Sequence, residues 1–257
     1  MEQDEQKNPM RRDAIYQLTV SKKMVNVNEL SQQMGVTPMT IRRDLEYLEK
    51  KGLVERVHGG AIPSKHGLFE PLFSQKNQQH VKEKDAIAQM AATMIENYET
   101  LFINSGTTTL RIFTKITAHH VKIVTNNACF PMVKIPEYVD VISTGGSFNS
   151  ESFTYYGDIA SQTIQQTWAT KAFVGVDGID IEHGLTTPLQ ADNQVNRMMI
   201  EHTRGKVIVV TDSSKIGKVS NFFIEPISVV NTLITDNGIS DKAKEDFIKL
   251  GIQVIIV

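Results

Sequence analysis

The stretch from Gly35 to Ala61 reads GVTPMTIRRDLEYLEKKGLVERVHGGA and decides the fold of the N-terminal region. Its charged residues surround three apolar positions at helical spacing, which are Ile41, Leu45 and Leu48. Thr37 is a favoured N-cap residue, and Pro38 is well placed at the first position of a helix. The pattern therefore predicts a helix that begins near Pro38 and buries one apolar stripe.

A shorter helical pattern precedes this one in the segment VNVNELSQQMGV. Asn26 can cap this helix, and Glu29 lies three residues later, as in a capping box. Gly35 suits the left-handed position that ends such a helix. Two short helices joined by a tight turn form a helix-turn-helix, in which the second helix enters the DNA major groove.

The segment after the second helix, LVERVHGGA, predicts a short β-hairpin that would act as a wing against the DNA backbone or minor groove. Arg56 and His58 are two residues apart, so on a strand they share one face. Gly59 and Gly60 would end the hairpin.

The exposed side of the second helix and the wing supply the candidate DNA-binding side chains. Arginine can donate two hydrogen bonds to guanine or hold a phosphate. The candidates are Thr37, Pro38, Met39, Thr40, Arg42, Arg43, Arg56 and His58. A solvated face with internal ion pairs is the alternative interpretation, and the agreement of cap, turn, apolar stripe and wing disfavours it.

The residues MTIRRDLEYLEKKGLVERVHGGA resemble the signature of the DeoR family of bacterial sugar-metabolism repressors. The resemblance runs almost without gaps from about Met10 to Ala61. It implies a winged helix-turn-helix DNA-binding domain for residues 1–62 and double-stranded operator DNA as a partner.

The length and composition of the chain indicate its general class. The chain has 257 residues, a formal net charge of −2 and 40% hydrophobic residues, which is typical of a soluble globular protein of one or two domains. No stretch approaches the roughly 20 apolar residues of a membrane-spanning helix, and no membrane partner is expected. The single cysteine, Cys129, excludes an internal disulfide and favours a reducing cytoplasm. No cofactor and no metal site is indicated.

The second half of the chain has a different pattern. From Thr100 onward seven short apolar runs recur, namely TLFIN, VKIVT, VDVIST, AFVGV, KVIVV, TLIT and QVIIV. Stretches of helical length, such as Gln190–His202 and Ser240–Leu250, lie between several of them. This alternation predicts an α/β domain with a largely parallel sheet over residues 81–257. The intervening residues 63–80 mix Pro, Gly, Ser and amides and are expected to be a linker.

The clearest local signal in this half is LFINSGTTTLRIF, in which a strand runs into Ser105, Gly106, Thr107, Thr108 and Thr109 and then into a helix. Successive hydroxyls and free backbone N–H groups at a helix start favour an anion, typically a phosphate. Ordinary helix capping explains the turn equally well when it is considered alone.

Other strand ends carry compatible chemistry, and ligands of open parallel sheets bind outside the carboxyl ends of the strands. These ends hold Asn126, Asn127, Gly145, Gly146, Asp177, Asp212 and Lys215. A phosphorylated polyol suits them, because a lysine and backbone donors would take the phosphate and Asp177 or the asparagines the hydroxyls.

From about Glu70 to Val257 the chain resembles the sensor domain of the same family, with SGTT, GVDGI and DSSK as markers. The resemblance implies a doubly wound α/β fold similar to ribose-5-phosphate isomerase and glucosamine-6-phosphate deaminase. It also implies that Ser105–Thr109, Gly145, Gly146, Asp177 and Lys215 line the effector site. With Asn126 from the strand ends, these are the candidate effector residues. Three positions depart from the family pattern. Asn104 replaces an acid, Asn196 replaces a lysine, and Lys76 replaces an arginine.

The expected function is a DNA-binding transcriptional regulator, a repressor of a sugar-uptake or catabolic operon whose DNA binding is controlled by a phosphorylated sugar. The alternative is a phosphosugar isomerase-like enzyme with an accessory DNA-binding domain. Isomerisation needs a positioned carboxylate base, for which the loop VDGIDIEHG offers Asp177, Asp180 and Glu182. The fold does not confer that reaction, and the enzyme reading leaves the N-terminal region unexplained, so no catalytic residue is assigned. Homodimers or homotetramers on repeated half-sites are expected.

Overall fold

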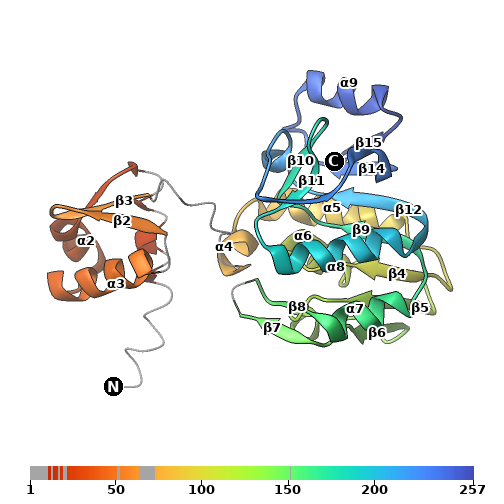
Figure 1. The fold of residues 1–257 in the computed structure, drawn as a ribbon, viewed down its shortest axis with the longest axis horizontal. Helices are drawn as coiled ribbons and strands as arrows, with labels where there is room; N and C mark the ends of the chain where they lie inside the picture. Colours follow the sequence, from red (N-terminus) through yellow and green to blue (C-terminus); the bar gives the residue numbers. More distant parts are fainter. Residues whose placement is uncertain are drawn as a thin grey trace. The chain divides into compact units, whose positions relative to one another are not determined.

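A computed structural model of the chain describes residues 11–12, 14–16, 18–19, 22–50, 53–63, 73–150 and 152–257. The chain divides into two compact units, Met1–Phe69 and Glu70–Val257. Figure 1 shows the helices and strands of each unit.

The first unit contains a helix-turn-helix followed by a β-hairpin. Residues 11–12, 14–16 and 18–19 are helical, and the helices described in full are α2 (Val27–Met34) and α3 (Pro38–Lys50). The described strands are β1 (Val25–Asn26), β2 (Val54–Val57) and β3 (Gly60–Pro63). The strands form an antiparallel sheet in the order β1-β3-β2. This arrangement is the winged helix-turn-helix that the sequence predicts.

Local signals at the helix ends act largely as expected. The Asn26 side chain accepts a hydrogen bond from the Asn28 N–H at 2.8 Å and so caps α2. Gly35 ends α2 in the left-handed conformation, with φ of 64°. Thr37 Oγ1 accepts the Thr40 N–H at 3.3 Å at the start of α3. The predicted N-cap residues and the predicted C-terminal glycine are therefore confirmed.

The wing differs from the prediction in one detail. His58 lies in the turn with Gly59, not on a strand face shared with Arg56. Gly60 begins β3, and a Cβ there would lie 1.9 Å from the Val25 carbonyl oxygen, so only glycine lets β3 approach β1 this closely. The two glycines thus have separate roles, one in the turn and one in the sheet.

The core of the first unit contains the predicted apolar stripe of α3. Its buried residues are Ile15, Val25, Val27, Leu30, Ile41, Leu45, Leu48, Val54 and Ala61. These side chains come from the helical residues before Val25, from α2 and α3, and from the sheet, and their burial holds the small unit together.

The second unit is built on a seven-stranded parallel sheet in the order β15-β14-β12-β9-β4-β5-β6. The strands are β4 (Thr100–Ile103), β5 (Val121–Thr125), β6 (Val139–Ser143), β9 (Ala169–Val174), β12 (Thr203–Val210), β14 (Thr232–Thr235) and β15 (Gln253–Ile256). All seven apolar runs found in the sequence are strands of this sheet, so the prediction of an α/β domain is confirmed.

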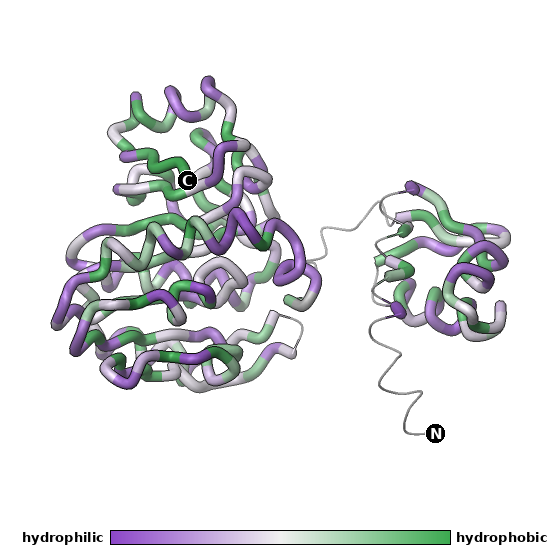
Figure 2. Tube along the Cα trace, turned by 180° about the vertical axis from the view of Figure 1, so that it is seen from behind, coloured by the Kyte–Doolittle hydropathy of each residue, from purple (hydrophilic) through white to green (hydrophobic). Residues whose placement is uncertain are grey.

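Helices cover both faces of this sheet. They are α4 (Phe73–Gln78), α5 (Val81–Thr93), α6 (Thr107–Ile112), α7 (Asp158–Gln165), α8 (Gln190–Glu201) and α9 (Asp241–Lys249). Leu101 and Ile103 of β4 pack in one core cluster with α5 and α6, whereas Phe102 packs in the other with α7 and α8. In Figure 2 the strands near the C-terminus are hydrophobic, while α9 carries mainly hydrophilic residues.

The strand order places a topological switch point between β4 and β9. The chain proceeds outward from β4 through β5 to β6, and it then returns to the other side of β4 to form β9, β12, β14 and β15. In doubly wound sheets the ligand crevice opens at this point, outside the carboxyl ends of the strands.

Smaller elements surround that end of the sheet. They are the hairpin of β7 (Ser147–Asn149) and β8 (Thr154–Tyr156), the sheet of β10 (Gly178–Asp180), β11 (Gly184–Thr187) and β13 (Phe222–Glu225), and the 3-10 turns Phe130–Met132, Ser213–Lys215 and Ile227–Val229. Helix α4 lies within residues 63–80, which were expected to be a linker, and it contacts α6. The last part of that segment is therefore a packed helix.

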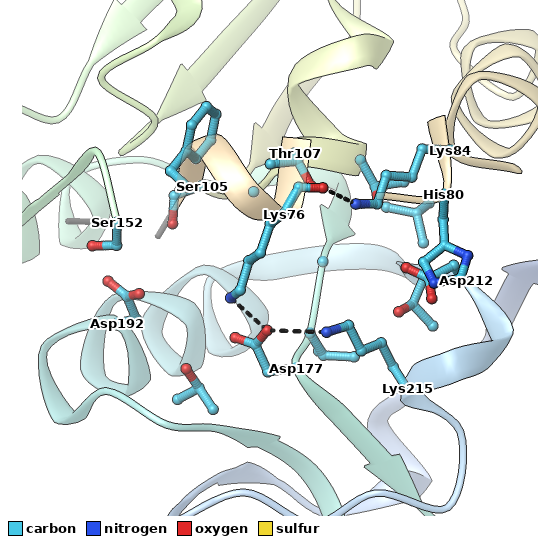
Figure 3. A pocket seen from close by; sticks show the side chains of 18 of the residues that line it. Lys76, His80, Lys84, Ser105, Thr107, Ser152, Asp177, Asp192, Asp212 and Lys215 are labelled. Carbon is cyan, nitrogen blue, oxygen red and sulfur yellow. Dashed lines mark hydrogen bonds and ion pairs between the residues drawn. The ribbon is translucent and has the colours of Figure 1, made fainter. Parts of the chain in front are cut away.

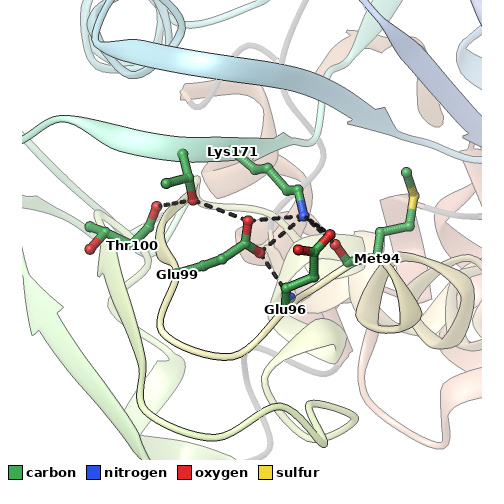
Figure 4. Close-up of polar contacts among 6 residues, drawn as sticks. Met94, Glu96, Glu99, Thr100 and Lys171 are labelled. Atoms are coloured by element: carbon green, nitrogen blue, oxygen red, sulfur yellow. Dashed lines mark hydrogen bonds and ion pairs between the residues drawn. The ribbon is translucent and has the colours of Figure 1, made fainter.

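A lysine fixes the opposite, amino-terminal ends of the two switch-point strands (Figure 4). Lys171 of β9 lies 2.9 Å from Glu99 Oε1 and donates a hydrogen bond to the Met94 carbonyl at 2.7 Å. Thr170 Oγ1 donates to the Thr100 carbonyl at 3.0 Å. These contacts tie β9 to the loop that leads into β4, so the two strands that carry the switch point are held in register.

Among the described residues, no helix has the length and apolar character needed to cross a membrane.

Candidate functional site

The exposed face of α3 carries the predicted DNA-binding side chains. Arg42 and Arg43 are exposed, and among the described residues neither forms an ion pair. Met39 is exposed and Thr40 half-buried in the first turn of the same helix. Two unpaired guanidinium groups near a helix N-terminus are the donors that base edges and phosphates accept.

Arg56 in the wing has a partner within its own unit. Its backbone N–H donates to Glu49 Oε1 at 3.2 Å, and its guanidinium lies 3.9 Å from Glu49 Oε2. The alternative interpretation, a paired surface charge, therefore fits Arg56 better than it fits Arg42 or Arg43. His58 is exposed in the turn of the wing.

A buried carboxylate holds this face in place. Asp44 is on the inner side of α3 and accepts hydrogen bonds from Arg11 Nε at 2.6 Å and from Arg12 Nε at 2.9 Å. The Arg12 guanidinium also lies 3.9 Å from the centre of the Tyr47 ring. Arg11 and Arg12 are thereby bound to the helix that presents Arg43, and the sequence analysis did not identify this contact.

The second candidate site is a cavity at the carboxyl ends of β4, β9 and β12, at the switch point. Its lining comprises Phe73, Lys76, Gln79, His80, Lys84, Ser105, Gly106, Thr107, Thr108, Ser152, Thr154, Gly175, Val176, Asp177, Thr187, Asp192, Asn196, Val210, Thr211, Asp212, Ser214 and Lys215. Of the predicted effector residues, the structure places six in this lining: Ser105, Gly106, Thr107, Thr108, Asp177 and Lys215.

The other four predicted residues lie outside this lining. Thr109 is buried and donates to the Asn104 carbonyl at 2.8 Å. Asn126 accepts the Ser105 N–H at 2.7 Å, so it positions the loop that lines the cavity. Gly145 and Gly146 have positive φ, and a Cβ on Gly146 would lie 2.5 Å from the Tyr156 carbonyl oxygen. The structure therefore gives Gly146 a packing role, because it permits this close approach.

An ion-pair network lies at the centre of the cavity (Figure 3). Lys76 Nζ of α4 is 2.6 Å from Asp177 Oδ1, and Lys215 Nζ is 3.8 Å from the same oxygen. Burial opposes ionisation of Asp177, but the two ammonium groups outweigh it and lower the pKa of the carboxyl. Asp177 is therefore an ionised partner of two lysines.

Lys84 adds a third cation to the wall. It is 4% exposed and donates a hydrogen bond to the Lys76 carbonyl. Burial lowers the pKa of its ammonium to about 8, although the Asp212 carboxylate opposes this effect. Burial also lowers the pKa of Lys215. Three lysines that converge on one cavity favour an anionic ligand.

Residues that depart from the family pattern contact one another at the end of β4. Asn104 Nδ2 donates to Asn196 Oδ1 and to the Gly175 carbonyl, both at 2.9 Å. Asn104 Oδ1 accepts the Gly175 N–H at 2.8 Å. Where the resemblance leads us to expect an acid and a lysine, this chain therefore has a neutral amide pair that joins β4, β9 and α8.

The sequence analysis missed several lining residues, among them Lys84 and Asp192. Both lie on the buried faces of helices, Lys84 with Ile87 and Ala88 in α5, and Asp192 with Val195 in α8. A charged residue at an apolar position of a helical pattern is the signal that would have found them. Within the described part of the chain, no cluster of three or more His, Cys, Asp or Glu residues could hold a metal ion.

Comparison with known proteins agrees with this architecture. Residues 11–66 match the model of the DeoR-like helix-turn-helix domain, and residues 79–237 match that of the DeoR C terminal sensor domain. A putative aga operon transcriptional repressor of Escherichia coli O157:H7 is 35% identical over 252 residues, which cover 96% of this chain and 93% of that protein.

Other similar proteins have related names. The HTH-type transcriptional regulator GlpR of Haloferax volcanii is 31% identical over 90% of both chains. A lactose phosphotransferase system repressor of Staphylococcus epidermidis is 28% identical over 95% of this chain and 98% of its own. Ribose 5-phosphate isomerase A of Neisseria gonorrhoeae has a TM-score of 0.36 at 14% identity over 54% of each chain. This similarity is too low to assign a function.

These relatives are named as transcriptional regulators, not as enzymes, and they align with both units of the chain. The winged helix-turn-helix, the sensor unit and the full-length matches lead to one classification. The chain belongs to the DeoR family of transcriptional regulators.

Proposed function

We propose that this protein represses an operon for sugar uptake or catabolism, and that a phosphorylated sugar bound in the switch-point cavity controls its DNA binding. The observation that carries the proposal is the convergence of Lys76, Lys84 and Lys215 beside the hydroxyl-rich loop Ser105–Thr108 in a DeoR-type sensor. Relatives named as operon and lactose-system repressors support the regulatory part.

The lysine end of the cavity suits the phosphate. Lys84 is held against the Lys76 carbonyl, and Ser105, Thr107 and Thr108 line the same cavity. Charge-assisted hydrogen bonds from ammonium groups to phosphate are shorter and stronger than neutral ones. A dianion would also relieve the repulsion among lysines that burial places close together.

The DNA-binding face is assigned to the outer side of α3. Arg42 and Arg43 are exposed and unpaired among the described residues, and the start of α3 offers Thr37, Pro38, Met39 and Thr40. In helix-turn-helix proteins these positions of the second helix contact base edges. Arg56 and His58 of the wing would contact the DNA backbone.

The isomerase alternative loses support at its proposed base. Asp177 is ion-paired with two lysines, which lower its pKa and make it a weak base. Asp180 accepts hydrogen bonds from the Glu182 and His183 N–H groups and lies outside the cavity lining. Neither acid has the raised pKa of a general base suited to neutral pH.

The experiment is a fluorescence-anisotropy titration of a duplex from the protein's own promoter region, with and without phosphorylated sugars. We expect tight, salt-sensitive binding that at least one sugar phosphate alters. Turnover of a sugar phosphate without any DNA effect would favour the enzyme alternative instead. A cytoplasmic location and a homodimeric or homotetrameric assembly stay predictions.

A further inference from the structure

The cavity contains a carboxylate, that of Asp192, on the side away from Lys84 and Lys215. Figure 3 shows Asp192 on one side of the ion pair between Lys76 and Asp177, with Lys84 and Lys215 on the other side. A ligand whose phosphate reaches the lysines would extend its other end toward Asp192.

Asp192 is buried, yet one of its two carboxylate oxygens has no hydrogen-bond partner among the described residues. It is 5% exposed in the first turn of α8, and its Oδ1 accepts a hydrogen bond from Thr154 Oγ1 at 2.9 Å. Thr154 Oγ1 also pairs with Ser152 Oγ at 2.9 Å. Among the described residues Oδ2 has no hydrogen-bond partner, and Asp192 forms no ion pair. Oδ2 is not one of the fully buried polar atoms that lack a partner, so it is reached from the cavity that Asp192 lines. A largely buried carboxylate that offers one oxygen to a ligand cavity is a mark of a functional group.

One helical turn later, Asn196 offers the complementary donor. The Gly175 backbone fixes the orientation of the Asn104 amide, so Asn104 Nδ2 is the donor toward Asn196, and Asn196 Oδ1 is the acceptor. Asn196 Nδ2 is then left without a partner among the described residues, in the wall of the cavity. Residues four apart lie on the same face of a helix, so Asp192 and Asn196 present an acceptor and a donor side by side.

We propose that Asp192 and Asn196 determine specificity by binding a pair of adjacent oxygens on the effector, remote from its phosphate. Asp192 Oδ2 accepts a hydrogen bond from a sugar hydroxyl, and Asn196 Nδ2 donates one to the neighbouring oxygen. The effector class is a sugar phosphate that keeps adjacent hydroxyl groups at its distal end. This inference rests on the proposed function, in which the cavity binds a phosphorylated sugar.

The test separates the two ends of the cavity with two probes. Inorganic phosphate reports the lysine end alone. A panel of fructose 1-phosphate, glucose 6-phosphate, galactose 6-phosphate and tagatose 6-phosphate reports both ends. Titration calorimetry of the full-length protein gives the Kd of inorganic phosphate and of the panel member that binds the wild type most tightly.

Two variants address the distal end, and one variant is the control. Asp192→Asn removes the carboxylate and keeps the size of the side chain, while Asn196→Ala removes the donor and leaves Asn104 bonded to Gly175. Asp158→Asn, in the first turn of α7 and outside the cavity lining, is the matched control. Circular dichroism verifies that each variant is folded, and either cavity variant alone suffices for the test.

We expect each cavity variant to bind the sugar phosphate about tenfold or more weakly than the wild type, as for loss of one charged or buried hydrogen bond. The affinity for inorganic phosphate should not fall. The control should bind both probes like the wild type. Unchanged affinity for the sugar phosphate in Asp192→Asn and Asn196→Ala would overturn the inference. An equal loss of affinity for the sugar phosphate and for inorganic phosphate would also overturn it. A wild type that binds no panel member would instead refute the proposed function.

Discussion

Lys76 Nζ lies 2.6 Å from Asp177 Oδ1, and this contact joins α4 to the end of β9 across 101 positions of sequence. Lys215 approaches the same oxygen from the loop after β12. Arg111 donates to the Asn77 carbonyl and side chain at 3.0 Å each, so α4 is also held from α6. Helix α4, the first described element of the sensor unit, is thus attached to the cavity wall by its own cation.

A double-mutant cycle on this ion pair measures its contribution. We expect Lys76→Met and Asp177→Asn to destabilise the sensor unit, and the pair to show a coupling energy of about 1–3 kcal/mol because both side chains are largely buried. Trp168 is the single tryptophan and lies in this unit, so its fluorescence during urea unfolding gives the free energies. Additive effects of the two substitutions would show that the contact does not stabilise the fold.

The buried acid Asp192 predicts a pH-dependent stability. Burial raises the pKa of its carboxyl from 3.8 to about 6. Between these values the folded protein holds a proton that the unfolded chain releases, so this group lowers stability as pH rises from about 4 to 6. The expected penalty above pH 6 is about 3 kcal/mol, at 1.36 kcal/mol per pKa unit.

Asp192→Asn removes that penalty. We therefore expect the variant to be more stable than the wild type at neutral pH, with a difference that shrinks toward pH 4. Urea unfolding followed by Trp168 fluorescence at a series of pH values checks this. A stability difference that stays constant across the series would contradict the raised pKa.

Lys84 predicts how anion binding depends on pH. Because burial lowers the pKa of its ammonium to about 8, the group loses its charge in more alkaline solution. Sugar-phosphate affinity should then fall above about pH 8, by up to about tenfold per pH unit for one proton taken up on binding. Lys84→Arg, which stays charged, should flatten the profile. Calorimetric titrations from pH 7 to 9.5 measure this, and an affinity independent of pH would exclude Lys84 from the phosphate site.

Substitution of Arg43 should change DNA binding and leave the sensor unit unaffected. Arg43→Ala should weaken specific binding to promoter DNA by about 1–3 kcal/mol if the side chain contacts a base. Arg197→Ala in the sensor unit, an arginine paired with Glu201 and Glu225, is the control. Anisotropy titrations with specific and scrambled duplexes provide the comparison. Wild-type affinity in Arg43→Ala would remove this residue from the DNA-binding face.

The buried Asp44 predicts an effect confined to the DNA-binding unit. Asp44→Asn leaves Arg11 and Arg12 without their carboxylate, and loss of one partner of a buried pair costs about 3–5 kcal/mol. We expect lower DNA affinity and an unchanged Trp168 unfolding transition. Glu46→Gln, which breaks an exposed pair with Lys50, should change neither. An unaltered DNA affinity in Asp44→Asn would show that the contacts of Arg11 and Arg12 are not needed to hold α3 in its DNA-binding position.

Much of this architecture could be predicted from local sequence. The strands could be found because buried parallel strands are continuous apolar runs. The caps at Asn26 and Thr37 and the turn at Gly35 are set by residues within one helical turn, so short-range chemistry identifies them.

The cavity was less predictable because its contacts join distant segments. Lys76 meets Asp177 only when α4 packs against the sheet, and no local pattern encodes that distance. Gly146 lies in a glycine-rich segment typical of a ligand-binding loop. Its packing role, however, follows from the close approach of the Tyr156 backbone, which no local pattern reveals. Asp192 and Lys84 occupy apolar helix positions, where polar residues become informative only once the buried face is known.

The most direct test of the central claim compares the wild type with Lys215→Met in one assay. Each protein is bound to labelled promoter DNA and titrated with the panel of sugar phosphates while anisotropy is recorded. The account predicts that both proteins bind the DNA equally and that a sugar phosphate changes the DNA affinity of the wild type but not of Lys215→Met. A wild-type affinity that no sugar phosphate changes, or an equal response of the variant, would contradict it.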